Sequence, residues 1–173
     1  MRVLGIDPGL GRTGIAVVDG RPGRLSLVHS QCLETIPQTQ DATRLASLLE
    51  LVETAARSFR PDVAAVELLF FTNNQRTAMR VAEARGVILC SLARAGVAIN
   101  EYTPTQVKEV LTGHGGASKP QVARMVRMLL SVEEMPSIDD EVDACAVAVC
   151  HHHRAALSAA LGSQRRLGPR LPA

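Results

Sequence analysis

The stretch Arg2-Val3-Leu4-Gly5-Ile6-Asp7-Pro8-Gly9 decides the architecture, because a short apolar run ends there in a turn. A second, β-branched run follows at Thr13–Val18. The turn residues Asp19-Gly20-Arg21-Pro22-Gly23 separate it from an alternating segment that begins at Leu25. Apolar runs with such short connections are typical of antiparallel hairpins. The beginning of the chain therefore predicts three strands paired as a meander.

Alternating helices and strands follow the meander. Apolar residues recur at helical spacing between Asp41 and Arg57, and Pro61 ends that helix. Val63–Val66 is apolar throughout, as in a strand that is covered on both faces. The further predicted elements are a helix over about 74–95, a strand over 97–102, and helices that begin at Thr103-Pro104, Ser118 and Asp139. The order predicts an α/β fold, a five-stranded mixed sheet with helices on both faces.

The bulk composition is that of one globular domain. The chain has 173 residues, of which 46% are hydrophobic and 21% are charged, and this length suits a single core. We expect one domain over residues 1–160 and a flexible basic tail over 161–173. Neither a leader segment nor a membrane-length apolar run is evident, and the four cysteines have mostly apolar neighbours. These features favour buried thiols and a cytoplasmic protein.

Basic residues are unevenly distributed along the chain. The net charge is only +2, but eight basic residues stand against three acidic ones between Thr72 and Met128. Such a local excess suits a polyanionic partner such as nucleic acid. Arginines spread over solvated helices would give the same count, so charge alone leaves both interpretations open.

Four carboxylates stand where a buried core disfavours them. Asp7 ends the first apolar run, and Glu67 lies between a second run and Leu68-Leu69-Phe70-Phe71. Asp140 and Asp143 are three residues apart near a helix start, so their side chains project from one face. Burying an unpaired carboxylate costs several kcal/mol or shifts its pKa. Acids at such positions therefore indicate a function.

Each carboxylate also has a purely structural interpretation. Asp7 could cap the turn that follows it, and Glu67 could form a salt bridge with an arginine. Ser137-x-x-Asp140 resembles a capping box, and acids in a first turn stabilise the helix dipole. The segment after Asp143 is apolar on every face, however, which predicts a helix buried against the sheet.

Convergence at one point would explain all four acids together. Converging carboxylates repel one another, and a dry site keeps them ionised only when a cation neutralises them. Hard oxygen ligands select Mg²⁺ or Mn²⁺. Two such ions roughly 4 Å apart clamp a phosphodiester during in-line attack. The pattern therefore predicts hydrolysis of a phosphodiester bond with two metal ions.

Two lysines and two phenylalanines add candidate contacts to a nucleic acid. Lys108 and Lys119 are the only lysines beside seventeen arginines, and a compact ammonium differs from a guanidinium as a phosphate contact. Lys119 opens a helix after a glycine-rich segment, where a mobile loop would let it reach a bound phosphate. Phe70 and Phe71 face opposite ways if they lie on a strand, so one could pack in the core and the other stack on a base.

Five short motifs run in order across about 150 residues. They are Leu4-Gly5-Ile6-Asp7-Pro8-Gly9 with Thr13-Gly14, Val66-Glu67 with Phe70, Gln106-Val107-Lys108, Gly113-x-Gly115-x-Ala117-x-Lys119-x-Gln121-Val122, and Asp140-x-x-Asp143-Ala144-x-Ala146. Each motif is weak alone, but the ordered set is highly specific. It resembles the RuvC family of bacterial Holliday-junction resolvases, which have the RNase H-like fold.

The resemblance implies a homodimer that binds four-way DNA junctions and nicks two strands symmetrically, with the branch-migration proteins RuvA and RuvB as partners. It implies two Mg²⁺ or Mn²⁺ ions in each active site, bound by Asp7, Glu67, Asp140 and Asp143. Lys108 and Lys119 would act near the scissile phosphate. The implied DNA-binding residues are Phe70, Phe71, Asn74, Arg76, Lys108 and Lys119. Glu141 departs from the family pattern, which leaves open which acid beside it holds the metal.

Other function classes share some of these features. Actin-like ATPases share the early Asp-x-Gly-x-x-x-x-Gly motif, but they need two such domains and a far longer chain. A DNA-binding protein without catalytic activity would lack some of the four acids. All four are present here, which argues against this class. An RNase H-like nuclease that acts on another nucleic acid stays open. His151-His152-His153 point three ways on a helix, so we expect them at the surface or partly packed, whereas His114 could approach DNA.

Overall fold

The computed structural model describes residues 1–68, 75–133 and 136–165 of the chain. The strands within these ranges are β1 (Arg2–Asp7), β2 (Arg12–Arg21), β3 (Arg24–Glu34), β4 (Val63–Glu67) and β5 (Ala98–Tyr102). The helices are α1 (Asp41–Phe59), α2 (Gln75–Arg94), α3 (Pro104–Thr112), α4 (Lys119–Leu130) and α5 (Asp139–Arg165). This is the element order that the sequence predicts.

The strands of the described residues form one mixed sheet in the order β3-β2-β1-β4-β5. Antiparallel pairing joins β1 to β2 and β2 to β3. Parallel pairing joins β1 to β4 and β4 to β5. The predicted meander and the predicted mixed sheet are therefore confirmed. Because β1 and β4 are parallel neighbours, their carboxyl ends meet at the same edge of the sheet.

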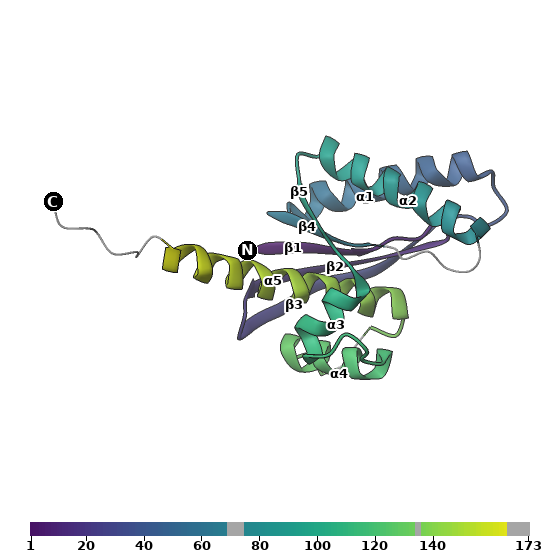
Figure 1. The fold of residues 1–173 in the computed structure, drawn as a ribbon. Coiled ribbons are helices and arrows are strands. Elements are labelled where there is room, and N and C mark those ends of the chain that lie inside the picture. Colours follow the sequence, from purple (N-terminus) through teal and green to yellow (C-terminus); the bar gives the residue numbers. More distant parts are fainter. Residues whose placement is uncertain (69–74, 134–135, 166–173) are drawn as a thin grey trace.

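Helices cover both faces of the sheet, as Figure 1 shows. On one side lie α1 and α2, and α5 crosses the other side with α3 and α4 beside it. Alternate residues of β1 point into two separate cores. Leu4 and Ile6 are buried in the core with α1 and α2, whereas Val3 is buried in the core with α5. This double covering explains why the strand sequence is apolar without interruption.

Two glycines let α5 lie directly on the sheet. A Cβ added to Gly5 of β1 would overlap the backbone carbonyl oxygen of Ala144, and one added to Gly14 of β2 would overlap that of Asp140. Only a residue without a side chain permits this approach. The glycines therefore set how closely the first turns of α5 lie above the end of β1.

The far end of α5 is longer than the sequence predicts. The prediction ends this helix near Ala160, but it continues to Arg165. Residues 161–165, which we expected in the flexible tail, are thus helical, and residues 166–173 lie outside the described part of the chain. No helix in the described ranges is both long and apolar enough to span a membrane.

The histidines of α5 are packed more deeply than expected. His151 is 6% exposed and its Nδ1 lies 2.7 Å from the hydroxyl of Tyr102, while His152 is 1% exposed and its Nε2 lies 3.1 Å from the carbonyl oxygen of Val18. The surface interpretation is therefore wrong for these two residues, because α5 packs against β2 and its His151 contacts Tyr102 of β5. Among the cysteines, two are buried as predicted and Cys90 is exposed.

Candidate active site

Two carboxylates lie side by side at the carboxyl edge of the sheet. Asp7 is the last residue of β1 and Glu67 is the last residue of β4. The parallel register pairs Ile6 with Val66, the residues immediately before them. The apolar strands that precede both acids are buried on both faces, so the sheet holds the two side chains rigidly at its edge.

A cavity of about 310 Å³ opens over these two carboxylates. Its wall combines the two strand ends with α3, the start of α4 and the first turns of α5. The lining residues are Asp7, Glu67, Pro104, Val107, Lys108, Lys119, Val122, Asp143 and Ala146. Three of the four predicted acids and both predicted lysines therefore share one cavity, although they come from five elements.

The acids of this cavity are held in an unfavourable electrostatic environment. Burial, and then the negative charges of Glu67, Asp143 and Asp140, raise the pKa of Asp7 to about 8. Burial and the charge of Asp143 raise the pKa of Glu67 to about 7, although a hydrogen bond from Asp7 and the two lysines oppose this shift. Two carboxyl groups that share a proton in a buried pocket accumulate negative charge that a cation would relieve.

Lys119 supplies an internal counter-charge to the acids. Its Nζ lies 3.1 Å from Oδ2 of Asp143 and 3.9 Å from Oδ2 of Asp139. The hydrogen bond to Asp143 raises the pKa of Lys119, so the ammonium stays charged. Lys119 is the first residue of α4, and the capping box between Ser118 and Gln121 fixes this helix start. The start of α4 thus delivers a cation to the acids.

Lys108 reaches the same cavity from α3. The capping box between Thr103 and Gln106 begins this helix, as the sequence predicts, with Thr103 Oγ1 accepting from the Gln106 amide at 3.1 Å. Lys108 follows half a turn later and lowers the pKa of Glu67 by its charge. Within the described residues its ammonium forms no ion pair, which leaves it available to a ligand.

Asp140 lies differently from the other three acids. Arg12 of β2 approaches it, with Nε 3.1 Å from Oδ2, and Asp140 does not line the cavity. This oxygen is buried and accepts no hydrogen bond from the described residues, because the contact with Arg12 is close but poorly aligned. Sequence reasoning missed Arg12, since nothing in the chain marks which arginine folds back over the acids.

Glu141 is directed away from the acids. Ser30 of β3 donates a hydrogen bond from its hydroxyl to Oε2 of Glu141 at 2.6 Å. Glu141 therefore contacts the neighbouring strand, and the family departure at this position does not place an additional acid in the cavity.

The donor set suits a hard divalent cation. All the acidic groups offer oxygen ligands, and a buried oxygen of Asp140 has no hydrogen bond. Within the described residues, no three acidic, histidine or cysteine side chains come close enough to form a ready metal cage. Asp143 instead pairs with Lys119 and Asp140 with Arg12, so each of these acids faces a cation of the chain.

Several predicted DNA contacts fall where the structure gives no side-chain information. Phe70, Phe71 and Asn74 lie outside the described residues. Arg76 belongs to the first turn of α2, but its side chain lies outside the described part as well. The DNA-binding roles of these four residues therefore remain predictions.

The family model described as Crossover junction endodeoxyribonuclease RuvC matches residues 3–151. Relatives with that name include proteins of Heliobacterium modesticaldum, 44% identical over 153 residues (88% of this chain and 94% of the relative), and Pelotomaculum thermopropionicum, 45% identical over 154 residues (88% and 93%). The structure of Thermus thermophilus RuvC in complex with a Holliday junction substrate matches with a TM-score of 0.87 at 36% identity, covering 91% of this chain and 96% of that one.

A more distant solved structure bears on the fold alone. The yeast mitochondrial Holliday junction resolvase Ydc2 matches with a TM-score of 0.66 at 14% identity, covering 95% of this chain and 85% of that one. The match of the family model and the identity to the bacterial relatives both span most of the chain, including the acidic cavity. The chain therefore belongs to the RuvC family of crossover junction endodeoxyribonucleases.

Proposed function

We propose that this protein resolves four-way DNA junctions by nicking two strands symmetrically, and that hydrolysis occurs in the acidic cavity. The observation that carries the proposal is the pairing of Asp7 and Glu67, whose pKa values are raised to about 8 and 7, beside Asp143 and two lysines. Membership of the RuvC family implies dependence on a divalent metal and action in DNA recombination and repair. The relative solved with a Holliday junction supports a junction as substrate.

Asp7, Glu67, Asp140 and Asp143 would hold the metal, which we propose to be two Mg²⁺ or Mn²⁺ ions. Such ions activate an attacking water and stabilise the leaving 3′ oxygen. Asp7 and Glu67 would be ionised in the loaded site, because a divalent charge opposes the burial and repulsion that raise their pKa values. Arg12 and Lys119, which balance Asp140 and Asp143 in this structure, would then be freed from those acids.

The lysines would act on the phosphate. Lys108 has no ion-pair partner within the described residues, and its position in the wall directs its charge into the cavity. Lys119, once released from Asp143, would contact a non-bridging oxygen of the scissile phosphate. Fixed cations aimed at developing charge stabilise such a transition state. Catalysis would therefore use these two residues with the four acids.

The surrounding interface is proposed from the family resemblance. Phe70 or Phe71 would stack on or wedge against bases, and Asn74 and Arg76 would contact the DNA backbone beside the cavity. A homodimer would supply the two cavities that symmetric nicking needs, and RuvA and RuvB would deliver the junction. A chromosomal DNA substrate places these events in the cytoplasm.

One experiment tests the proposal. The protein is incubated with a mobile four-way junction in Mg²⁺, Mn²⁺ or EDTA, and the nicks are mapped on all four strands. We expect paired nicks in opposite strands with either metal and none in EDTA. Nicking that persists in EDTA would contradict the metal mechanism. Cleavage of an RNA–DNA hybrid but not of the junction would favour an RNase H-like nuclease with another substrate.

A further inference from the structure

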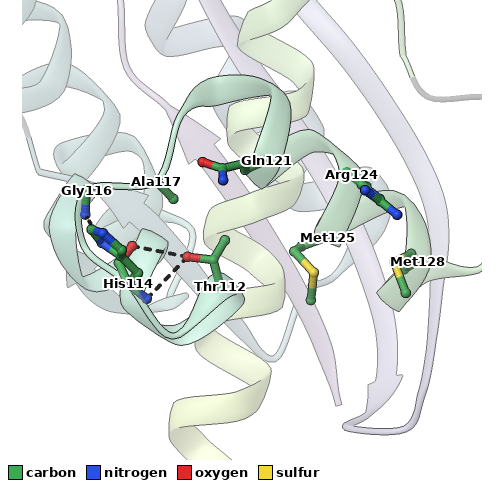
Figure 2. Close-up of a pocket in the computed structure, with 8 residues that line it drawn as sticks. All are labelled: Thr112, His114, Gly116, Ala117, Gln121, Arg124, Met125 and Met128. Carbon is green, nitrogen blue, oxygen red and sulfur yellow. Dashed lines mark hydrogen bonds between the residues drawn. The ribbon is translucent and has the colours of Figure 1, made fainter.

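A second cavity, of about 490 Å³, is lined in part by α4, the helix that also borders the acidic cavity. Figure 2 shows its residues, which come from the loop between α3 and α4 and from one face of α4. They are Thr112, His114, Gly116, Ala117, Gln121, Arg124, Met125 and Met128. Neither the proposed hydrolysis nor the family motifs give this cavity a role.

The loop wall of the cavity is a compact structure built around His114. Nδ1 of His114 accepts a hydrogen bond from the Gly116 amide at 2.7 Å, and the His114 carbonyl accepts from the Thr112 hydroxyl at 3.1 Å (Figure 2). A Cβ at Gly116 would collide with the imidazole ring. Because Nδ1 accepts, the neutral ring carries its proton on Nε2, and that N–H is free to donate.

The helix wall adds two further donors. The carbonyl oxygen of Gln121 accepts from the Ser118 amide at 2.8 Å as part of the capping box, which leaves the amide NH₂ free. Arg124 is exposed, and its guanidinium forms no ion pair or hydrogen bond within the described residues. The free side-chain groups of His114, Gln121 and Arg124 are therefore donors, so they suit a ligand rich in acceptors, such as a phosphate and the edge of a base.

Two methionines supply an apolar surface between these polar groups. In Figure 2, Met125 lies between Thr112 and Arg124. Met128 is 63% exposed, which is unusual for a side chain of this size. A thioether makes favourable contacts with aromatic rings. The combination of an apolar wall, donors and a guanidinium matches the base and phosphate of a nucleotide.

The second cavity is continuous with the proposed DNA interface. Lys119 and Val122 of α4 line the acidic cavity, and Gln121 and Met125 of the same helix line the second cavity. The two cavities therefore meet along α4. Stacked nucleotides rise about 3.4 Å each along a strand. A strand held at the acids and running past α4 would reach the second cavity within a few nucleotides.

We propose that this cavity binds one nucleotide of the cleaved strand, within a few nucleotides of the scissile phosphate. Arg124 contacts the phosphate, His114 and Gln121 donate to the base edge, and Met125 and Met128 pack against the base. The cavity therefore selects where the strand is cut. The inference rests on the proposed function, because it takes a DNA strand to be in the acidic cavity.

The base contact is tested with Gln121→Glu. The carboxylate keeps the acceptor that caps α4, but it replaces the free NH₂ with a group that accepts hydrogen bonds from cytosine amino groups. Junctions with randomised bases within four nucleotides of the nick are cut, and the products are sequenced. We expect Gln121→Glu to change the base preference about tenfold at one position. An unchanged preference in a variant with wild-type melting temperature overturns the inference.

The phosphate contact is tested with Arg124→Ala in an Asp7→Asn background, which leaves the junction uncut. We expect affinity for the junction to fall about tenfold for every sequence, and the salt dependence of log K to decrease by about 1. Arg127→Ala is the matched control, because Arg127 lies on the same helix but donates to the Glu133 carbonyl at 2.6 Å and does not line the cavity. Equal effects of the two substitutions would overturn the phosphate contact.

These outcomes separate this inference from the proposed function. Wild-type protein that cuts no junction contradicts the proposed function, and this inference with it. Wild-type protein that cuts junctions while Gln121→Glu and Arg124→Ala behave like wild type contradicts this inference alone.

Discussion

At the scale of single residues, Asp7 is expected to lower the stability of the protein and to be required for nicking. Its carboxyl group is buried beside Glu67 and within the field of Asp143, and both effects raise its pKa. We expect Asp7→Asn to abolish nicking and to leave junction binding intact. Because the amide carries no charge, the metal-free variant should be more stable, by on the order of 1–3 kcal/mol. Denaturant unfolding in EDTA, beside a nicking assay, measures both effects.

The neighbouring acid Asp139 provides the control for this substitution. Its side chain is 80% exposed and pairs only distantly with Lys119. Asp139→Asn should change neither stability nor nicking appreciably. Nicking by Asp7→Asn at a rate near that of wild type would remove Asp7 from the mechanism.

The raised pKa of Asp7 also predicts how stability depends on pH. Between the ordinary pKa near 3.8 and the folded pKa of about 8, the folded protein binds more protons than the unfolded chain. Its stability therefore falls as the pH rises through this window. The buried histidines, whose pKa values are lowered from 6.5, act in the opposite direction below pH 6.5. The range from pH 7 to 8.5 lies above the ordinary pKa of the histidines and includes the folded pKa of Asp7.

Metal-free protein should lose about 1 kcal/mol of unfolding free energy between pH 7 and 8.5. Added Mg²⁺ should restore it, since a ligand of the folded state stabilises that state. Urea unfolding at several pH values measures the effect. The loss should be smaller in Asp7→Asn, and equal losses in both proteins would show that another group titrates.

We expect Lys119 to contribute more to the rate of nicking than to the affinity for the junction. Lys119 pairs with Asp143 and lies in the wall of the acidic cavity. Lys119→Ala should slow single-turnover nicking roughly 100-fold, as expected when one stabilising donor is removed. Junction affinity should fall much less, because many other contacts hold the DNA. Lys119→Arg retains the charge and should recover part of the rate, whereas unchanged nicking by Lys119→Ala would argue against the proposed role.

At the scale of elements, the contact between α5 and the sheet decides the geometry of the site. A Cβ at Gly14 would overlap the carbonyl of Asp140, and neither backbone can yield easily. Gly14→Ala should therefore lift the first turn of α5, at a cost of about 1–3 kcal/mol. Nicking should fall more than binding, because Asp140 and Asp143 move with that turn.

Gly11→Ala is the matched control for this prediction. The nearest atom to its added Cβ is the flexible end of Arg44, at 3.4 Å. Its thermal unfolding and nicking should stay close to wild type. If Gly14→Ala also matched wild type in both measurements, the close approach of α5 would not be what positions the acids.

The elements also show why part of the site could be predicted from the sequence. Asp7 and Glu67 each end an apolar run, and parallel pairing of buried strands brings such ends together. The prediction that Asp140 and Asp143 lie near the start of a buried helix is correct, although only Asp140 belongs to its first turn. Local pattern is sufficient for these features, since a strand or a helix imposes its own periodicity.

Other features depend on contacts between distant segments. The three-residue spacing between Asp140 and Asp143 does not show that Asp140 pairs with Arg12 and does not line the cavity. The burial of His152 depends on α5 running beneath Val18, more than a hundred residues away. Because histidine is polar, its residue type predicts an exposed position. Only the packing of α5 against the sheet shows that His152 is buried.

At the scale of the whole molecule, one chain provides one acidic cavity within its described residues, whereas resolving a junction requires two nicks. We therefore expect a homodimer in solution, of about twice the 18.5 kDa chain mass. Wild-type and Asp7→Asn chains carrying different tags can be mixed, exchanged and purified as hybrid dimers. Because each cavity would act on its own strand, the hybrid should bind a junction normally but nick only one strand.

Strand-specific end labels distinguish the possible results for the hybrid. One nick per junction, with the opposite strand intact at long times, is expected if the cavities act independently within a dimer. Wild-type homodimers in the same buffer should cut both strands and release linear duplexes. If the hybrid cut both strands, a single cavity would suffice for the two nicks, and symmetric action by two subunits would be wrong.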